Sequence, residues 1–538
     1  MRRVWQTQVL IVGGGATGTA LARDLSLRGV ACVLTERDDI NAGASGRNHG
    51  LLHSGARYAS TDQDAATECQ EEGALLKRLA PQCVQETGGL FVAVRGDDER
   101  FIADFPGLCE RAGIEVRALD MGEAQALEPA LSPHTIAAYA VPDASVDPFK
   151  LSLENMAHAQ ALGARLLRRM GVVSFERVGS RLVAANLLNR DTGEEMGVEA
   201  QVIVNAAGAW SREVAVMAGL DVPMIYSKGT LLITHARVAH RVLNRLRKPS
   251  DADIIMPGGS VSLVGTTSIT VSTLDDMEPS IPEVDLIIDE AAAMVPMLEH
   301  TRYVRAYAGV RPLISAGAAA ADGRSVSRGF ALIDHGAEGL DNFVTITGGK
   351  LTTCRLMAEK AANWACERLG ITAACTTHLA PLPIAPAYEG TEPGLSARAW
   401  MGERADDDML LCECEMVSLS SLDAIADELQ SSRGQMVLAD LALRSRLGKG
   451  ACQGTFCTMR AAAHLYNRGI LKGDRGLYES MQFFGERWRG QHPILWGEQL
   501  AQAELAEAIH CGFHGRELHD LTPLETSEGS SQDSEATR

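Results

Sequence analysis

Residues 9–36 constrain the fold of this chain more than any other stretch. A β-rich run over 9–12 leads into G-G-G-A-T-G, a helical pattern follows, and a second β-rich run over 30–34 ends at Glu36. This order predicts a β–α–β unit whose glycine-rich turn lets the backbone approach a pyrophosphate, while the acidic residue binds the ribose hydroxyls. We expect an α/β fold with a dinucleotide site rather than a structural turn alone, and the spaced glycines are Gly13, Gly15 and Gly18.

The number of such loops bears on which dinucleotide is bound. We find one G-x-G-x-x-G loop in the 538 residues. An enzyme that carries FAD and is itself reduced by NAD(P)H through a two-nucleotide fold usually shows a second loop. A strand-like run that ends in N-A-A-G-A-W, residues 205–210, also favours FAD. We therefore predict FAD as the sole cofactor and an organic substrate as the electron donor.

Composition limits the partners and the compartment. The chain has 50 Lys and Arg against 69 Asp and Glu, a net charge of −19, which argues against nucleic acid as a partner. Twelve cysteines are too sparse for a disulfide scaffold and indicate a reducing compartment. No run approaches 18 apolar residues, and no signal-peptide cleavage site follows Arg2 and Arg3. We expect a cytoplasmic protein.

A polar, glycine-rich stretch, N-H-G-L-L-H-S-G-A-R-Y over residues 48–58, follows the nucleotide-binding unit. In such folds this position lies near the flavin ring, so His53 is the candidate base that accepts a substrate hydroxyl proton while hydride leaves the adjacent carbon. His49 is a weaker candidate. The alternative for either imidazole is a hydrogen bond to the cofactor or to a loop.

Cationic side chains gather late in the first 380 residues. Residues 302–328 hold five arginines and one acidic residue, Asp322, so this segment is locally positive in a chain whose overall charge is negative. Arginine suits bidentate recognition of phosphate or carboxylate, and Arg311 in G-V-R-P-L is the strongest candidate, although structural ion pairing would produce the same enrichment. The later G-G-K-L-T-T offers Lys350 and backbone donors that would stabilise negative charge on a reduced flavin, unless it is only a surface turn.

Four cysteines in the last third of the chain form a candidate metal site. The two pairs are C-x-C and C-x₄-C, and the four residues are Cys412, Cys414, Cys452 and Cys457. Four thiolates bind either zinc or an iron–sulfur cluster, and C-x-C is tighter than the usual zinc spacing. We favour [2Fe–2S] over structural zinc, with scattered core thiols as the third alternative. A flavin beside such a cluster suggests that hydride enters and single electrons leave through partner proteins.

Taken together, these motifs resemble a known family. The G-G-G-A-T-G start, G-R-N-H-G-L-L-H-S-G-A-R-Y, R-K-P-S-D-A-D-I, G-V-R-P-L, T-G-G-K-L and C-E-C-E-M-V with C-Q-G-T-F-C resemble the A subunits of anaerobic, FAD-dependent glycerol-3-phosphate dehydrogenases. The resemblance covers roughly residues 8–470. It implies oxidation of sn-glycerol 3-phosphate to dihydroxyacetone phosphate, with B and C subunits on the inner membrane passing electrons to quinone. Two positions depart from the family pattern. Four residues separate the two cysteines of the second pair, whereas small ferredoxin relatives often have two. Cys354 stands where relatives often carry Tyr.

The resemblance also implies roles for individual residues. The substrate contacts are expected from Arg57, Tyr58, Arg311 and Arg328, and the catalytic groups are His53, Lys350 and Arg311. The remaining expected cofactor contacts, beyond the three spaced glycines, are Glu36, Arg37, Ser45, His49, Gly50, Leu51, Ala207, Gly208, Gly348, Gly349, Lys350, Leu351 and Thr352.

The resemblance and the linker composition together divide the chain. The expected fold is a glutathione-reductase-like, D-amino-acid-oxidase-type unit over 1–380, with nucleotide-binding and mixed-sheet substrate subdomains interleaved. A Pro-rich linker over 381–395 precedes a [2Fe–2S] domain over 396–475 that resembles bacterioferritin-associated ferredoxin. A helical extension over 476–515 and a polar, disordered tail over 516–538 complete the prediction.

Two other functions fit the same residues. An FAD-dependent amino-acid or amine dehydrogenase would use the arginines to bind a carboxylate instead of a phosphate. A non-catalytic electron-transfer subunit would keep the flavin and the cluster without substrate chemistry.

Overall fold

A computed structural model describes residues 3–275, 277–314, 329–385, 402, 407–431 and 435–512. Three predictions fall outside these residues: the role of Arg328, the linker beyond residue 385, and the tail over 516–538.

The first sheet carries the predicted β–α–β unit. Strands β1 (Arg3–Val12) and β2 (Cys32–Thr35) pair in parallel with Val9 opposite Cys32, and helix α1 (Ala16–Leu27) connects them. The strand order is β10-β11-β12-β1-β2-β9, and β20 pairs with β12 on the edge that β11 also uses. The other members are β9 (Arg165–Leu167), β10 (Met170–Val178), β11 (Arg181–Asn189), β12 (Glu195–Asn205), β19 (Phe330–Asp334) and β20 (Phe343–Gly348).

Helices cover this sheet because its parallel strands are apolar on both faces. Val9, Leu10 and Ile11 of β1 are fully buried, and α1 packs between α5 (Pro148–Ala161) and α8 (Cys354–Leu369). Helix α6 (Ser211–Met217) follows β12.

A second sheet of nine strands forms the substrate half. Its order is β17-β13-β16-β15-β14-β5-β7-β6, and the long strand β18 pairs with β13 along its whole length. The strands are β5 (Gly89–Val94), β6 (Arg117–Leu119), β7 (Thr135–Val141), β13 (Met224–Thr234), β14 (Val242–Arg245), β15 (Ile254–Gly258), β16 (Val261–Gly265), β17 (Ile269–Val271) and β18 (Tyr303–Ile314). Helices α2 (Gln63–Leu79), α3 (Glu99–Arg111), α4 (Met121–Leu127) and α7 (Ile281–Ala292) accompany it. A third sheet pairs β3 (Leu51–Leu52) and β4 (Val84–Gln85) with β8 (Ala144–Val146). In the sequence, β3 and β4 precede β5 and β8 follows β7.

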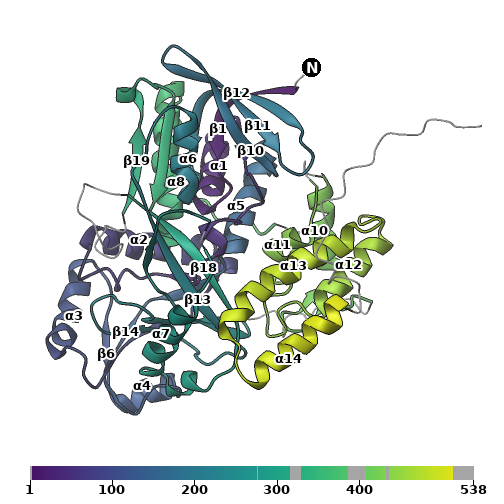
Figure 1. Ribbon diagram of the computed structural model, residues 1–538. Helices are drawn as coiled ribbons and strands as arrows, with labels where there is room; N and C mark the ends of the chain where they lie inside the picture. Colours follow the sequence, from purple (N-terminus) through teal and green to yellow (C-terminus); the bar gives the residue numbers. More distant parts are fainter. Residues whose placement is uncertain are drawn as a thin grey trace, which may run out of the picture.

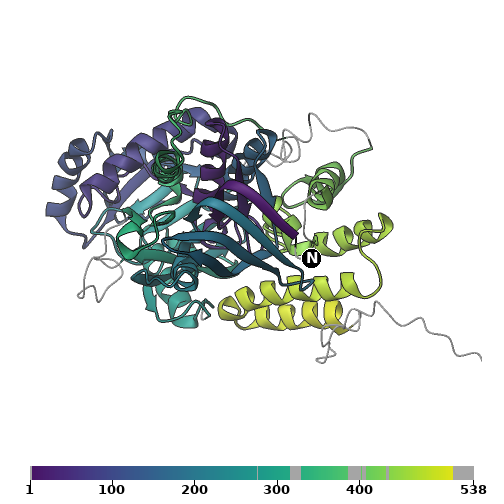
Figure 2. The ribbon, with the colours of Figure 1, turned by 90° about the horizontal axis from the view of Figure 1, so that it is seen from above.

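The C-terminal part is small and mostly helical. A hairpin, β21 (Leu410–Cys412) and β22 (Val417–Ser418), precedes α10 (Leu419–Ser431), α11 (Leu438–Arg444), α12 (Cys457–Asn467), α13 (Arg475–Gln491) and α14 (Glu498–Glu507). Figure 1 shows these green and yellow helices gathered on one side of the larger body, next to both sheets, and Figure 2 shows the same side from above.

Apolar packing joins the C-terminal helices to the rest of the chain. One continuous buried cluster runs from β1, α1 and α8 into α10, α11 and α12, and it includes the side chains of Cys412 and Cys457. Ile494, just after α13, is fully buried in the core of the substrate half. The docked arrangement therefore removes apolar surface of both parts from water. Among the described residues, no helix combines the length and the hydropathy needed to cross a bilayer.

Candidate functional site

A cavity of about 970 Å³ runs from the glycine-rich loop to the substrate sheet. At its nucleotide end the glycine-rich loop lines it with backbone, beside the side chains of Glu36 and Ser45. Gly13 has φ +114°, and a Cβ added there would lie 2.6 Å from the carbonyl oxygen of Ala206, so only glycine fits without displacing backbone. Gly15 also lines the cavity, whereas Gly18 packs behind it against the carbonyl of Gly13. Such a loop uses its first glycine for the turn, its second for the close approach of a pyrophosphate and its third for helix–strand packing, and the three positions here agree with that division.

Glu36 at the end of β2 faces the same loop. Its carboxylate accepts hydrogen bonds from the N–H of Gly14 at 2.7 Å and from the N–H of Asp38 at 2.8 Å. Burial raises the pKa of Glu36 to about 7, although these two donors favour the ionised form. A buried carboxylate with remaining acceptor capacity is suited to a hydroxyl donor such as a ribose, which would add a third hydrogen bond to the charged form.

Most of the predicted cofactor contacts lie on the cavity wall. Ser45 holds the start of α1 by accepting a hydrogen bond from the N–H of Ala16 at 2.9 Å. Gly50 and Thr352 stand behind the wall, where Thr352 accepts a hydrogen bond from the N–H of His53. The predicted contacts that line the cavity are Gly13, Gly15, Glu36, Arg37, Ser45, His49, Leu51, Ala207, Gly208, Gly348, Gly349, Lys350 and Leu351.

The two histidines meet in the middle of the cavity. His49 and His53 lie with ring centroids 5.8 Å apart, and the Tyr58 hydroxyl is 3.3 Å from His53 Nε2. Burial lowers the pKa of His53 well below its usual value, and the nearby cations Arg57 and Lys350 lower it further. Burial also lowers the pKa of His49 to about 3, with contributions from Arg311 and Arg57. Both imidazoles are therefore neutral at physiological pH, and their lowered pKa values make them weaker bases than a free imidazole.

Cationic groups define the substrate end. Arg311 on β18 donates to the carbonyl of Thr267 at 3.1 Å and to the hydroxyl of Thr266, and a Cβ at Gly229 would lie 2.6 Å from its guanidinium. Arg57 donates to Asp253 at 3.0 Å and also lines the cavity. These contacts hold both side chains in one orientation, so little rotamer entropy is lost when an anion binds.

Lys350 lines the same cavity as Arg311 and Arg57. It follows β20, and its ammonium lies 5.0 Å from the centroid of the Tyr58 ring. Cys354, at the start of α8, also lines the cavity, and burial raises the pKa of its thiol to about 12, so it stays protonated. The tyrosine-to-cysteine departure thus places a neutral thiol there rather than a thiolate.

Sequence reasoning missed several cavity residues. Lys248 and Ser250 line the substrate end, although their R-K-P-S-D-A-D-I motif by itself indicates no role. Its turn lies next to Arg57, because the Ser250 carbonyl accepts from that guanidinium. Trp210 lines the nucleotide end, where the Arg37 guanidinium stacks 4.9 Å from its ring centroid. The sequence did not place the 248–250 turn on the cavity, and in the 205–210 segment it predicted contacts from Ala207 and Gly208 but not from Trp210.

The four predicted metal ligands come together in the C-terminal part. Cys457 hydrogen-bonds to Cys412 and Cys452, which lowers the pKa of both, and Cys414 contacts Cys452. In the described part of the chain, no three of these four sulfurs all lie within 4.8 Å of one another. A tetrahedral zinc at about 2.3 Å from each sulfur would bring all of them to about 3.8 Å. The donor set is therefore spread more widely than a single zinc ion requires.

Comparison with known proteins assigns the chain to a family. The family model described as "FAD dependent oxidoreductase" matches residues 8–364. Among the A subunits of anaerobic glycerol-3-phosphate dehydrogenases, that of Escherichia coli K12 is 42% identical, over 96% of this chain and 98% of that protein. The one from Haemophilus influenzae is 40% identical, over 98% of this chain and 96% of that protein. The chain belongs to the family of these A subunits.

Solved structures agree on the fold. The glycerol-3-phosphate dehydrogenase of Bacillus halodurans, complexed with FAD, has a TM-score of 0.62 at 19% identity, covering 91% of this chain and 96% of that one. Glycine oxidase of Geobacillus kaustophilus has a TM-score of 0.57 at 22% identity, covering 71% of this chain and 99% of that one. The predicted FAD-oxidoreductase fold of the D-amino-acid-oxidase type, with mixed sheets, is confirmed.

Proposed function

We propose that this chain oxidises sn-glycerol 3-phosphate to dihydroxyacetone phosphate with FAD as its cofactor. The observation that carries the proposal is the cavity itself, which joins a dinucleotide loop at one end to Arg311 and Arg57 at the other, with two neutral histidines between them. The names of the relatives point to the same substrate.

The residues present fit FAD. Gly13, Gly14 and Gly15 line the cavity beside the start of α1, where the positive end of the helix dipole favours the negative charge of a pyrophosphate. Glu36 offers the acceptor that a ribose needs, and the wall continues through Ala207, Gly208 and the 348–351 turn. FAD supplies the hydride acceptor for the reaction.

The chain's own groups supply binding and proton transfer. Arg311 and Arg57, with Tyr58, bind the phosphate and orient the substrate, so that its C2 hydrogen would face a bound FAD, which would accept it as hydride. We assign the hydroxyl proton to His53 because its neutral imidazole lines the cavity beside the Tyr58 hydroxyl. Lys350 stabilises the negative charge that the cofactor gains. Arg328 is proposed as a further phosphate ligand on the resemblance alone.

The four thiols fit a [2Fe–2S] cluster. Their wider spacing favours two metal ions over one zinc, and cysteine thiolates are the usual ligands of such clusters. We propose that electrons leave through this cluster to B and C subunits and to membrane quinone, and that these partners hold the chain at the inner membrane. The segments 396–475 and 476–515 are the proposed cluster domain and helical extension.

Anaerobic reduction tests the activity. Pure protein mixed with glycerol 3-phosphate without oxygen should lose its visible flavin absorbance, and glycine, alanine and simple amines should not produce this loss. Bleaching by an amino acid but not by glycerol 3-phosphate would establish the amino-acid dehydrogenase alternative instead. Iron and sulfide analysis of anaerobically purified protein tests the cluster, and stoichiometric zinc would contradict it.

A further inference from the structure

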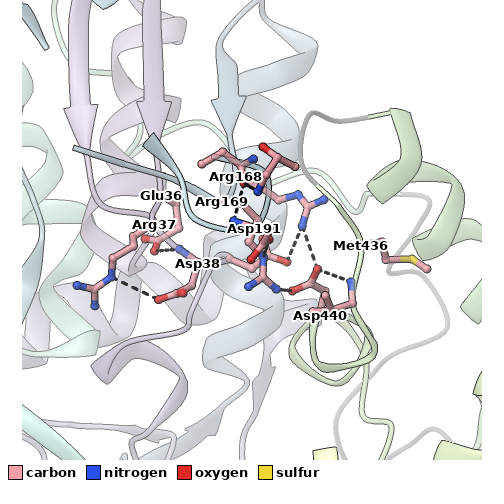
Figure 3. A network of polar contacts seen from close by, with 12 residues as sticks. Glu36, Arg37, Asp38, Arg168, Arg169, Asp191, Met436 and Asp440 are labelled. Atoms are coloured by element: carbon pink, nitrogen blue, oxygen red, sulfur yellow. Dashed lines mark hydrogen bonds and ion pairs between the residues drawn. The ribbon is translucent and has the colours of Figure 1, made fainter. Parts of the chain in front are cut away.

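The C-terminal part is fastened to the nucleotide-binding sheet by a buried ionic network. Arg444 on α11 forms two hydrogen bonds to Asp39, at 2.7 and 2.9 Å, just beyond the end of β2. Arg168 and Arg169, in the turn after β9, reach Asp440 on α11 at 3.2 and 2.5 Å. Figure 3 shows the two arginines meeting Asp440 a short way from the Glu36 segment that faces the nucleotide loop.

This network sets the position of the C-terminal part. Arg168 and Asp440 are fully buried, and Asp39 and Arg444 are nearly so. The charges of Arg444 and Arg168 overcome the effect of burial and keep the pKa of Asp39 below its usual range. Charges buried in this way hold a single geometry, because moving one partner leaves the other unpaired in a low-dielectric environment.

With the C-terminal part held in this position, the loop that carries Cys452, residues 447–453 (the cysteine loop), lies behind the cavity wall. The short turn η1 (Ala44–Gly46) contributes Ala44 and Ser45 to the cavity. Behind it stands Phe149, whose ring would be 2.9 Å from a Cβ at Gly46. The Lys449 ammonium also contacts this ring, at 3.4 Å from its centroid. The next residue, Gly450, is packed so tightly against Cys414 that a Cβ there would overlap the cysteine's own.

Further contacts hold this junction together. Arg446 pairs with Glu415 and lies 3.6 Å from Asp147, the residue that caps the helix on which Phe149 sits. The Ser260 hydroxyl donates to Glu415 at 2.5 Å. The wall of the cavity is therefore joined to the cysteine loop through the Phe149 ring and the Lys449–Gly450 segment.

We propose that Phe149, with the Lys449–Gly450 segment, is the contact across which electrons pass from the cavity to the four-cysteine site. The inference rests on the proposed function. Each passage moves one electron from the reduced flavin to the oxidised cluster, and no bond to the protein forms or breaks. The two electrons of each hydride cross singly, the flavin's proton is released to solvent, and the external acceptor takes both electrons. Phe149 forms the contact itself, and the Asp39–Arg444 and Arg168–Asp440 pairs are the positioning groups that maintain it.

The test uses the full chain loaded with FAD and cluster, in four forms beside the wild type. Phe149→Leu removes the ring and keeps apolar bulk, and Phe149→Tyr restores the ring. Phe175→Leu is the matched control, a half-buried phenylalanine on β10 in contact with Phe343. Asp440→Asn weakens the ion pairs of Arg168 and Arg169 with residue 440. Flavin bleaching is followed optically after anaerobic mixing with glycerol 3-phosphate, and cluster reduction by freeze-quench electron paramagnetic resonance.

We expect Phe149→Leu to bleach at the wild-type rate while cluster reduction slows by about tenfold or more, equivalent to roughly 1.4 kcal/mol in the barrier. Phe149→Tyr and Phe175→Leu should reduce the cluster as the wild type does. Cluster reduction at the wild-type rate in Phe149→Leu would overturn the proposal, as would equal slowing of bleaching and cluster reduction. Failure of Phe149→Tyr to recover the rate would also overturn it.

Two measurements separate this proposal from the function on which it rests. If glycerol 3-phosphate does not bleach the wild-type flavin, the proposed function fails, and flash photoreduction of the flavin still tests the path. Hydrogen exchange over residues 447–453 reports docking without any turnover. We expect faster exchange in Asp440→Asn and wild-type exchange in Phe149→Leu. Faster exchange in Phe149→Leu would mean that the ring only supports docking, which overturns the path.

Discussion

At its nucleotide end the cavity presents mainly backbone, whereas at its substrate end it presents side chains from distant parts of the chain. The glycine loop, the start of α1 and Glu36 lie within 24 residues of one another, and their geometry follows from one β–α–β unit. The substrate end instead joins Arg57, Lys248, Arg311 and Lys350, which four separate segments bring together. The glycine loop of the first end is altered by filling backbone space, and the second end can be altered one charge at a time.

The largest effect is expected at the nucleotide end of the cavity. Gly13→Val places a β-branched side chain at φ +114° against the Ala206 carbonyl, so the loop must move and FAD should no longer be retained. The ratio of flavin to protein after desalting measures this loss. Gly107→Ala on α3, where a Cβ meets nothing within 4 Å, is the control that should keep its flavin. Full flavin content in Gly13→Val would show that this end is not a backbone site.

The next effect tests chemistry between the two ends. His53→Asn removes the proposed base, so the rate of flavin reduction by glycerol 3-phosphate should fall by about 10²–10⁴-fold with flavin content unchanged. Single-turnover reduction measures the rate, and His300→Asn at an exposed position is the control. A loss below about fivefold, a barrier change of only about 1 kcal/mol, would assign the proton to another group.

A smaller effect is expected for a single charge at the substrate end. Arg311→Ala should raise the KM for glycerol 3-phosphate by about 10–150-fold, since a hydrogen bond to a charged group contributes roughly 1.5–3 kcal/mol. FAD affinity should stay near the wild-type value. Arg311→Lys should recover only part of the loss because lysine lacks the bidentate fork. Equal losses of substrate and FAD binding would show that the two ends are not independent.

The smallest effect concerns pH. The pKa of His53 is lowered well below 6.5, so the neutral base persists as the pH falls through 6.5 and protonation removes it only at lower pH. The rate of flavin reduction at saturating substrate should therefore show no acid limb from His53 between about pH 6.5 and 8, above the phosphate's second pKa of about 6. An acid limb centred near 6.5 that disappears in His53→Asn would contradict the buried, neutral state.

The sequence alone determined the parts of the protein that depend on neighbours in the chain. The β–α–β unit, its glycine roles, Glu36 and the paired cysteines all follow from local spacing, because turn conformation and ligand reach are short-range properties. Arg311 and His53 were also recognised as candidates from their motifs. Lys248 and Trp210 were not recognised, since nothing in the residues next to them shows that their side chains line the cavity.

Only the tertiary structure decided how these parts meet. It placed Gly50 and Thr352 behind the cavity wall, tied Arg57 to Asp253, and set the cysteine loop against Phe149 through ion pairs formed between residues about 400 positions apart, Asp39 and Arg444. Burial and charge depend on which surfaces pack together. The neutral state of His53 and the position of the C-terminal helices therefore arise from long-range packing, which local sequence does not specify.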